Sequence, residues 1–184
     1  MKKYIYVIVF VFATCCAATE LPVAPNGFLW QEVPTIKAAI LRPNDWFYKE
    51  DQSGTTTALF ITKESIQKKG RFETGLTLNC VRDIPAKAGM PPSAYAVAFA
   101  QEAATKHKLD EQMAFDHGPF KAVRFRYVDA SKGITSVTIC HLLIANDKTG
   151  TLFLVIFEAP TKNWENEWKL GEVILKKMLL DNDV

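Results

Sequence analysis

Residues 134–158, ITSVTICHLLIANDKTGTLFLVIFE, are the stretch of sequence that decides the fold class. They contain two segments, 134–145 and 151–158, that are apolar at nearly every position and are joined by the polar run 146–150. That run ends in glycine and is typical of a hairpin loop. Strands that are apolar on both faces need cover on both faces. The stretch therefore predicts the centre of an antiparallel sheet with a layer of structure on each side.

Two predicted helices supply these layers. The first spans about residues 91–107, with Ser93 as a candidate N-terminal cap and small apolar residues at helical spacing. The second closes the chain and places Trp168 and Leu175 on one apolar stripe. Gly171 lies on the same stripe. Because glycine weakens a helix by about 1 kcal/mol relative to alanine, its presence predicts a close approach of this helix to the sheet.

Further strand signals surround the central pair. β-Branched and aromatic residues gather between turn residues in six shorter segments, and these segments span residues 28–33, 36–41, 46–50, 55–62, 76–81 and 120–128. Together with the helices they predict the α+β class. The expected architecture is an α/β/α sandwich around an antiparallel sheet of about six to seven strands, with a closing C-terminal amphipathic helix.

This order of elements resembles the PsbP-like fold, including the bacterial DcrB-like exported proteins. The resemblance covers roughly residues 28–181. It rests on the element order, on the tryptophans of the closing helix and on Arg42-Pro43-Asn-Asp-Trp46, which looks like the Pro-x-x-Trp corner of that family. It implies a single PsbP-like domain over residues 28–184. Family members are mostly non-catalytic accessory or exported proteins, and the resemblance carries over no catalytic or cofactor-binding residue.

The N-terminal residues have the pattern of an export signal. Lys2 and Lys3 precede the short apolar run 4–13, and small residues follow it. Residues 1–18 are therefore predicted to be the export signal and residues 19–27, which are rich in turn formers, a spacer. The protein is expected to be exported, and to be periplasmic, secreted or anchored to the membrane as a lipoprotein.

Two modes of processing remain open at this signal. The sequence Cys16-Ala17-Ala18 suits cleavage after Ala18. Cys15 and Cys16 are instead candidates for lipid attachment, which would tether the domain to the membrane surface. Loss of Lys2 and Lys3 reduces the formal net charge from +2 to zero, since 20 basic residues then face 20 acidic ones. That balance argues against a nucleic-acid partner.

Cys80 and Cys140 are the cysteines that remain beyond the export signal. An even number of cysteines in an exported chain predicts a disulfide. The alternative is two separately buried thiols, because cysteine packs well as a small apolar side chain.

No established catalytic or phosphate-binding motif occurs in the chain. Asp116 and His117, in a polar turn before a strand, are the candidates for a metal contact, although two ligands are too few for a complete site. We therefore expect no cofactor. The sequence favours a non-catalytic exported binding or accessory protein of the cell envelope, which holds an unknown protein or small ligand. The alternative is a metal-dependent or hydrolytic envelope enzyme.

Overall fold

The structure is a computed structural model that describes residues 21–66, 72–130 and 136–184. The predicted export signal, with both lipidation candidates Cys15 and Cys16, lies outside the described residues. Within them, no helix combines the length and the apolar character that crossing a membrane requires.

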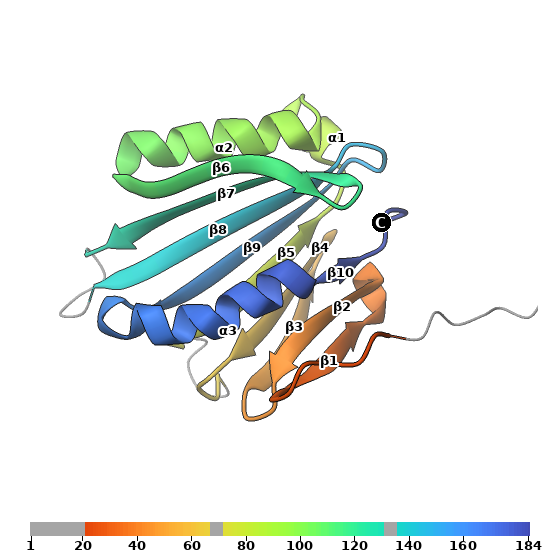
Figure 1. The fold of residues 1–184 in the computed structure, drawn as a ribbon. Helices are drawn as coiled ribbons and strands as arrows, with labels where there is room; N and C mark the ends of the chain where they lie inside the picture. Colours follow the sequence, from red (N-terminus) through yellow and green to blue (C-terminus); the bar gives the residue numbers. More distant parts are fainter. Residues whose placement is uncertain (1–20, 67–71, 131–135) are drawn as a thin grey trace, which may run out of the picture.

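A seven-stranded sheet forms the centre of the molecule (Figure 1). All its neighbouring strands are antiparallel, and the continuously apolar strands lie near its middle. In spatial order the strands are β3 (Phe47–Ser53), β4 (Thr56–Thr62), β5 (Gly75–Val81), β9 (Thr151–Pro160), β8 (Val137–Asn146), β7 (Phe120–Asp129) and β6 (Leu109–His117).

Each face of this sheet is covered by different elements. On one face, α2 (Pro92–Lys106) packs against β7, β8 and β9, and the short α1 (Ile84–Ala88) packs beside it. On the other face lies α3 (Trp164–Lys177), preceded by the 3₁₀ turn η2 (Thr161–Asn163). These layers confirm the predicted α+β sandwich around an antiparallel sheet.

A second, three-stranded sheet accompanies α3 on its face. It contains β1 (Phe28–Val33), β2 (Ala38–Pro43) and β10 (Leu179–Leu180), with the 3₁₀ turn η1 (Pro34–Ile36) between the first two strands. The sequence predicted the first two strands but not that they leave the main sheet. That layer of the sandwich is thus part helix and part sheet, because β2 packs against α3.

The structure differs from the sequence analysis at two places. Residues 109–117 form the edge strand β6, which the sequence analysis missed because its side chains are mostly polar and exposed. Ser93 does not cap α2, whose N-terminal cap is Pro91 without a side-chain hydrogen bond. The Ser93 hydroxyl instead donates to Asp147 in the β8–β9 loop, 2.6 Å away.

Phe157 lies at the centre of the core beneath α3. Its ring is fully buried and contacts the rings of Trp46, Trp164 and Trp168, with centroids 5.8–6.4 Å away. The turn between β2 and β3 places Trp46 in this position. The turn is closed by a hydrogen bond from the Trp46 amide nitrogen to the Pro43 carbonyl oxygen, 3.0 Å away. The Pro-x-x-Trp segment thus forms a corner that anchors the second sheet to the first.

The predicted disulfide between Cys80 and Cys140 is absent, and both residues are free, buried thiols. They lie on β5 and β8, with β9 between these strands, so about 10 Å separates them across the sheet. Cys80 pairs with Phe153 and Cys140 with Phe157, an offset of four residues, or about 13 Å, along β9. Disulfides require Cα atoms within about 7 Å, so the sheet register excludes the bond.

We expect neither of these thiols to react in the native state. Burial is the main cause that raises the pKa of Cys80 to about 11 and that of Cys140 to about 12, so both stay protonated at neutral pH. Intact-mass analysis after iodoacetamide treatment at pH 8 should show no alkylation of these two residues in the folded protein. In denaturant without reductant, we expect one carbamidomethyl group to be added at Cys80 and one at Cys140. Absence of these two additions would show that the thiols are bonded.

Candidate functional site

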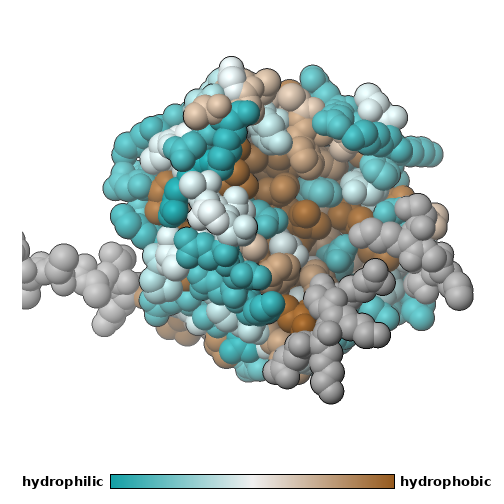
Figure 2. Space-filling view, turned by 180° about the vertical axis from the view of Figure 1, so that it is seen from behind, coloured by the Kyte–Doolittle hydropathy of each residue, from teal (hydrophilic) through white to brown (hydrophobic). Residues whose placement is uncertain are grey.

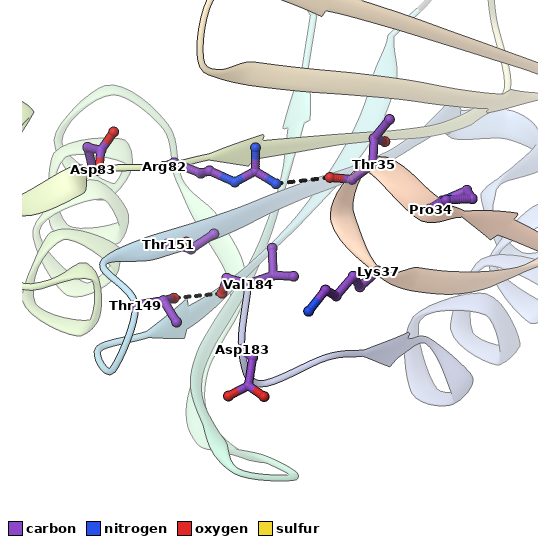
Figure 3. A pocket seen from close by; sticks show the side chains of 9 residues that line it. All are labelled: Pro34, Thr35, Lys37, Arg82, Asp83, Thr149, Thr151, Asp183 and Val184. Carbon is purple, nitrogen blue, oxygen red and sulfur yellow. Dashed lines mark hydrogen bonds between the residues drawn. The ribbon is translucent and has the colours of Figure 1, made fainter. Parts of the chain in front are cut away.

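A cleft of about 320 Å³ opens between the small sheet and one end of the large sheet (Figure 3). Four segments distant in the sequence form its walls: the η1 turn, the link from β5 to α1, the β8–β9 hairpin and the residues after β10. The lining residues are Pro34, Thr35, Lys37, Arg82, Asp83, Thr149, Thr151, Asp183 and Val184.

Two of these residues hold an unusual backbone conformation. Lys37, with φ 45°, and Asp83, with φ 61°, are the only non-glycine residues with positive φ in the described part of the chain. The left-handed region costs a residue other than glycine about 1–2 kcal/mol, with asparagine and aspartate the most tolerant. Such conformations tend to gather at functional sites. Both occurrences line the same cleft, from different sheets.

The arginine in the cleft links the two sheets. Arg82, at the end of β5, donates from Nη2 to the carbonyl oxygen of Thr35 in η1, 2.9 Å away. The hydroxyl of Thr35 in turn donates to Glu50 on β3 at 2.6 Å. These contacts hold the η1 turn against the large sheet and place the guanidinium group within the cleft.

The other charged groups are distributed along the cleft. The side chain of Lys37 points into it, whereas Asp83 lies at the opposite end beside α1 (Figure 3). Asp183 forms an ion pair with Lys148, 2.6 Å away. Lys148, and to a lesser extent Lys37, lower the pKa of Asp183. The main-chain oxygen of Val184 accepts hydrogen bonds from Asn146 and Thr149. The cleft is therefore polar, with two cationic side chains reaching into it.

We expect Lys37→Gly to leave the free energy of unfolding unchanged or to raise it by up to about 1.5 kcal/mol. Relief of the left-handed strain, about 1–2 kcal/mol, outweighs or balances the greater entropy that glycine loses on folding, about 0.5–1 kcal/mol. Urea unfolding measures the change. The same replacement at Lys176, in ordinary helical backbone, should lower stability by about 1 kcal/mol, and an equal loss at both sites would contradict the strain argument.

Asp116 and His117 are not brought together as a site. They are consecutive residues of the edge strand β6, so their side chains point to opposite faces. Asp116 pairs with Lys121 at 2.7 Å. His117 is half-buried, and burial lowers its pKa while a hydrogen bond with the backbone of Met178 acts in the opposite direction. Among the described residues no group of three or more His, Cys, Asp or Glu side chains is arranged to hold a metal ion.

The sequence analysis did not single out the residues of the cleft. The signals available were the turn before Lys37 and the proline that follows Ile84, both of which indicate an interruption of regular structure. Neither signal shows that the two interruptions meet, because their contact depends on how one sheet packs on the other.

Comparisons with known proteins relate the chain to others by fold. No family model matches the sequence, and no curated protein matches it. Several solved structures are similar at low identity, among them three with TM-scores above 0.5. The cyanobacterial PsbP protein CyanoP from Synechocystis sp. PCC 6803 is 11% identical, with a TM-score of 0.54 over 90% of this chain and 99% of CyanoP.

The other two structures come from different organisms. The Ran-binding protein Mog1p from Saccharomyces cerevisiae is 11% identical, with a TM-score of 0.53 over 83% of this chain and 95% of Mog1p. LpqN from Mycobacterium tuberculosis, described as involved in cell envelope biogenesis, is 13% identical, with a TM-score of 0.52 over 78% of this chain and 83% of LpqN. The arrangement of sheets and helices, together with these matches, shows that the chain has the PsbP-like fold.

Proposed function

We propose that this protein is a non-catalytic exported binding or accessory protein of the cell envelope, and that the cleft between its two sheets holds a ligand or a segment of a partner protein. The observation that carries the proposal is that Lys37 and Asp83, both in left-handed backbone, line one polar cleft. Strain of this kind persists only where surrounding structure maintains it. A binding role for the cleft explains why both strained residues lie in its lining.

Two further facts support the proposal. Arg82, just after β5, and Lys37, just before β2, both line the cleft, and two cationic side chains suit the binding of polar groups. Among proteins with the same fold, Mog1p is described as a Ran-binding protein and LpqN as a protein of cell envelope biogenesis. If Cys15 or Cys16, the two candidates for lipid attachment, carries lipid, that lipid holds the domain at the membrane; cleavage after Ala18 is the alternative.

Site-specific photo-crosslinking in the native cell tests the cleft. A photoreactive amino acid is placed at the exposed Thr35 in the cleft, and at the exposed Gln101 on α2 as the matched control. We expect a defined adduct, identified by mass spectrometry, at position 35 only. Adding Lys37→Glu should abolish it. Identical adducts at both positions, or none at position 35, would contradict the proposed site.

Fractionation tests the cellular location separately. The full chain should appear in the envelope or exterior fraction, with a mass that lacks residues 1–18 or that carries lipid on Cys15 or Cys16. Unprocessed protein in the cytosol would overturn the export part of the proposal. His117→Ala is expected to leave the biological activity intact in a folded protein, and complete loss of that activity would favour the enzyme alternative.

A further inference from the structure

A second cavity lies where the C-terminal end of α2 meets the large sheet. Its volume is about 150 Å³. The helix and the residue that caps it supply one wall, and β7 and β8 supply the other. Phe99, Ala103, His107, Phe125, Tyr127 and His141 line it. The exposed ion pair of Glu102 and Lys106 lines it as well.

Aromatic rings make up most of this cavity's lining. Phe125 and His141 are cross-strand partners, and their rings stack with centroids 4.7 Å apart. His107 stacks on Tyr127 with centroids 4.0 Å apart. Phe99 closes the helix side, with its ring centroid 5.8 Å from that of His141. Aromatic walls of this kind favour an aromatic occupant, because rings attract one another in stacked and edge-to-face arrangements.

Tyr127 contributes a hydroxyl group to the lining. The Tyr127 oxygen lies 3.4 Å from Nε2 of His141, longer than the range of about 2.5–3.0 Å for a strong O–H hydrogen bond. Burial is the main cause that raises the pKa of Tyr127, with the nearby Asp129 and Glu158 adding to it, so the hydroxyl stays protonated at neutral pH. It can therefore donate to a polar atom of an occupant.

A row of paired residues leads from His141 across the sheet, away from the cavity. His141 pairs with Ile156 on β9, Ile156 pairs with Thr77 on β5, and Thr77 pairs with Phe60 on β4. The side chains of Ile156 and Phe60 are partly exposed on this face. Figure 2, which looks onto the side of the molecule away from α3, shows apolar residues gathered in a hollow on that side. An occupant of the cavity can thus extend beyond it.

We propose that this cavity binds a single aromatic ring that carries a hydroxyl group, either a free phenol or the tyrosine side chain of a partner. The volume suits one six-membered ring, because a cavity of about this size lined by apolar side chains accepts benzene. The aromatic walls contact the faces and edge of the ring, and the Tyr127 hydroxyl forms a hydrogen bond with the hydroxyl group of the ligand. This site is distinct from the cleft beside Lys37 and does not depend on it.

Titration with p-cresol, followed by two-dimensional NMR on the folded protein, tests the ligand class. Toluene and 4-methylcyclohexanol are the matched probes, because the first lacks the hydroxyl group and the second lacks the aromatic ring. We expect p-cresol to shift the amide signals of Ala103, Phe125 and His141 and to bind about tenfold more tightly than either probe. Equal affinities, or shifts confined to other residues, would overturn the proposal.

Variants of the residues that line the cavity test where the ligand binds. Ala103→Leu should fill the cavity and abolish p-cresol binding, whereas Ala104→Leu, on the exposed side of the same helix, should leave it unchanged. Tyr127→Phe should retain toluene binding and lose the preference for p-cresol. Undiminished binding in a folded Ala103→Leu protein would contradict the assignment. The Tyr127→Phe result decides the question if Ala103→Leu fails to fold.

A blocked tripeptide, Gly-Tyr-Gly, distinguishes the two sources of the ring. If it binds at least as tightly as p-cresol and Gly-Phe-Gly binds about tenfold more weakly, the natural occupant is a tyrosine side chain. If p-cresol binds and both peptides are excluded, the occupant is a free phenol. Failure of all three ligands to bind refutes this proposal and leaves the proposal for the cleft unaffected.

Discussion

Replacing Gly171 with leucine is expected to lower the free energy of unfolding by about 3 kcal/mol, the upper end of the range for overpacking. A Cβ atom at Gly171 would lie 2.8 Å from Cζ of Phe157 and 2.9 Å from two further atoms of that ring. The ring cannot move aside easily, because Trp46, Trp164 and Trp168 enclose it. α3 would have to move away from the sheet to make room.

Alanine at this position should destabilise the protein less. The Cβ clash with Phe157 remains, but alanine gains about 1 kcal/mol of helix propensity over glycine. We expect a net loss of about 1 kcal/mol for Gly171→Ala, measured by urea unfolding. Lys169→Leu, exposed on the same helix, is the control and should change stability by less than about 0.5 kcal/mol.

A double-mutant cycle tests the cause of this loss. Phe157→Leu shortens the side chain that the new Cβ atom meets, so Gly171→Ala should cost less in that background than in the natural one. Additive effects would show that the crowding lies elsewhere. If Gly171→Leu unfolds like the natural protein, the close approach of α3 to the sheet is not what selects glycine here.

Replacing Phe157 with alanine is expected to cost about 3–5 kcal/mol of stability, the typical range for emptying a fully buried phenylalanine site. The ring fills the space between β9, α3 and the corner that holds Trp46. Its removal leaves a cavity and also deprives three tryptophans of their shared contact. Both the second sheet and α3 should therefore become less firmly attached to the large sheet.

Phe47→Ala is the control for this prediction. Phe47 lies on the edge strand β3 and is 46% exposed, so its removal should cost under about 1 kcal/mol. Hydrogen exchange of the amides in β2 and α3 gives a second measurement, with a much larger loss of protection expected for Phe157→Ala. Equal melting temperatures for the two variants would contradict the central role assigned to Phe157.

The candidate sites show where pattern-based inference stops. Asp116 and His117 attracted attention as neighbouring polar residues, yet alternation along β6 turns their side chains apart. His107, at the end of α2, stacks on Tyr127, twenty residues further along the chain. Side chains that are neighbours in the sequence need not be neighbours in the folded structure, and a site forms only from side chains that are close in space.

The fold class was accessible from local pattern because burial acts on each element separately. A strand that is apolar on both faces requires two covering layers, and a stripe of tryptophans around Gly171 requires a surface to pack against. These requirements hold whatever the strand order is, so the sandwich, its hairpin and its closing helix were predicted from the residues alone.

Other features depend on strand order and register. Many different pairings of the same strands would satisfy the local sequence patterns equally well. The insertion of β9 between β5 and β8 keeps Cys80 and Cys140 apart, although cysteine parity favoured a bond. The packing of η1 against the end of β5 brings Thr35 next to Arg82 and places Lys37 in the same cleft. Both features depend on the placement of segments that are far apart in the chain. Their geometry is fixed by the packing of whole sheets, which no local run of residues encodes.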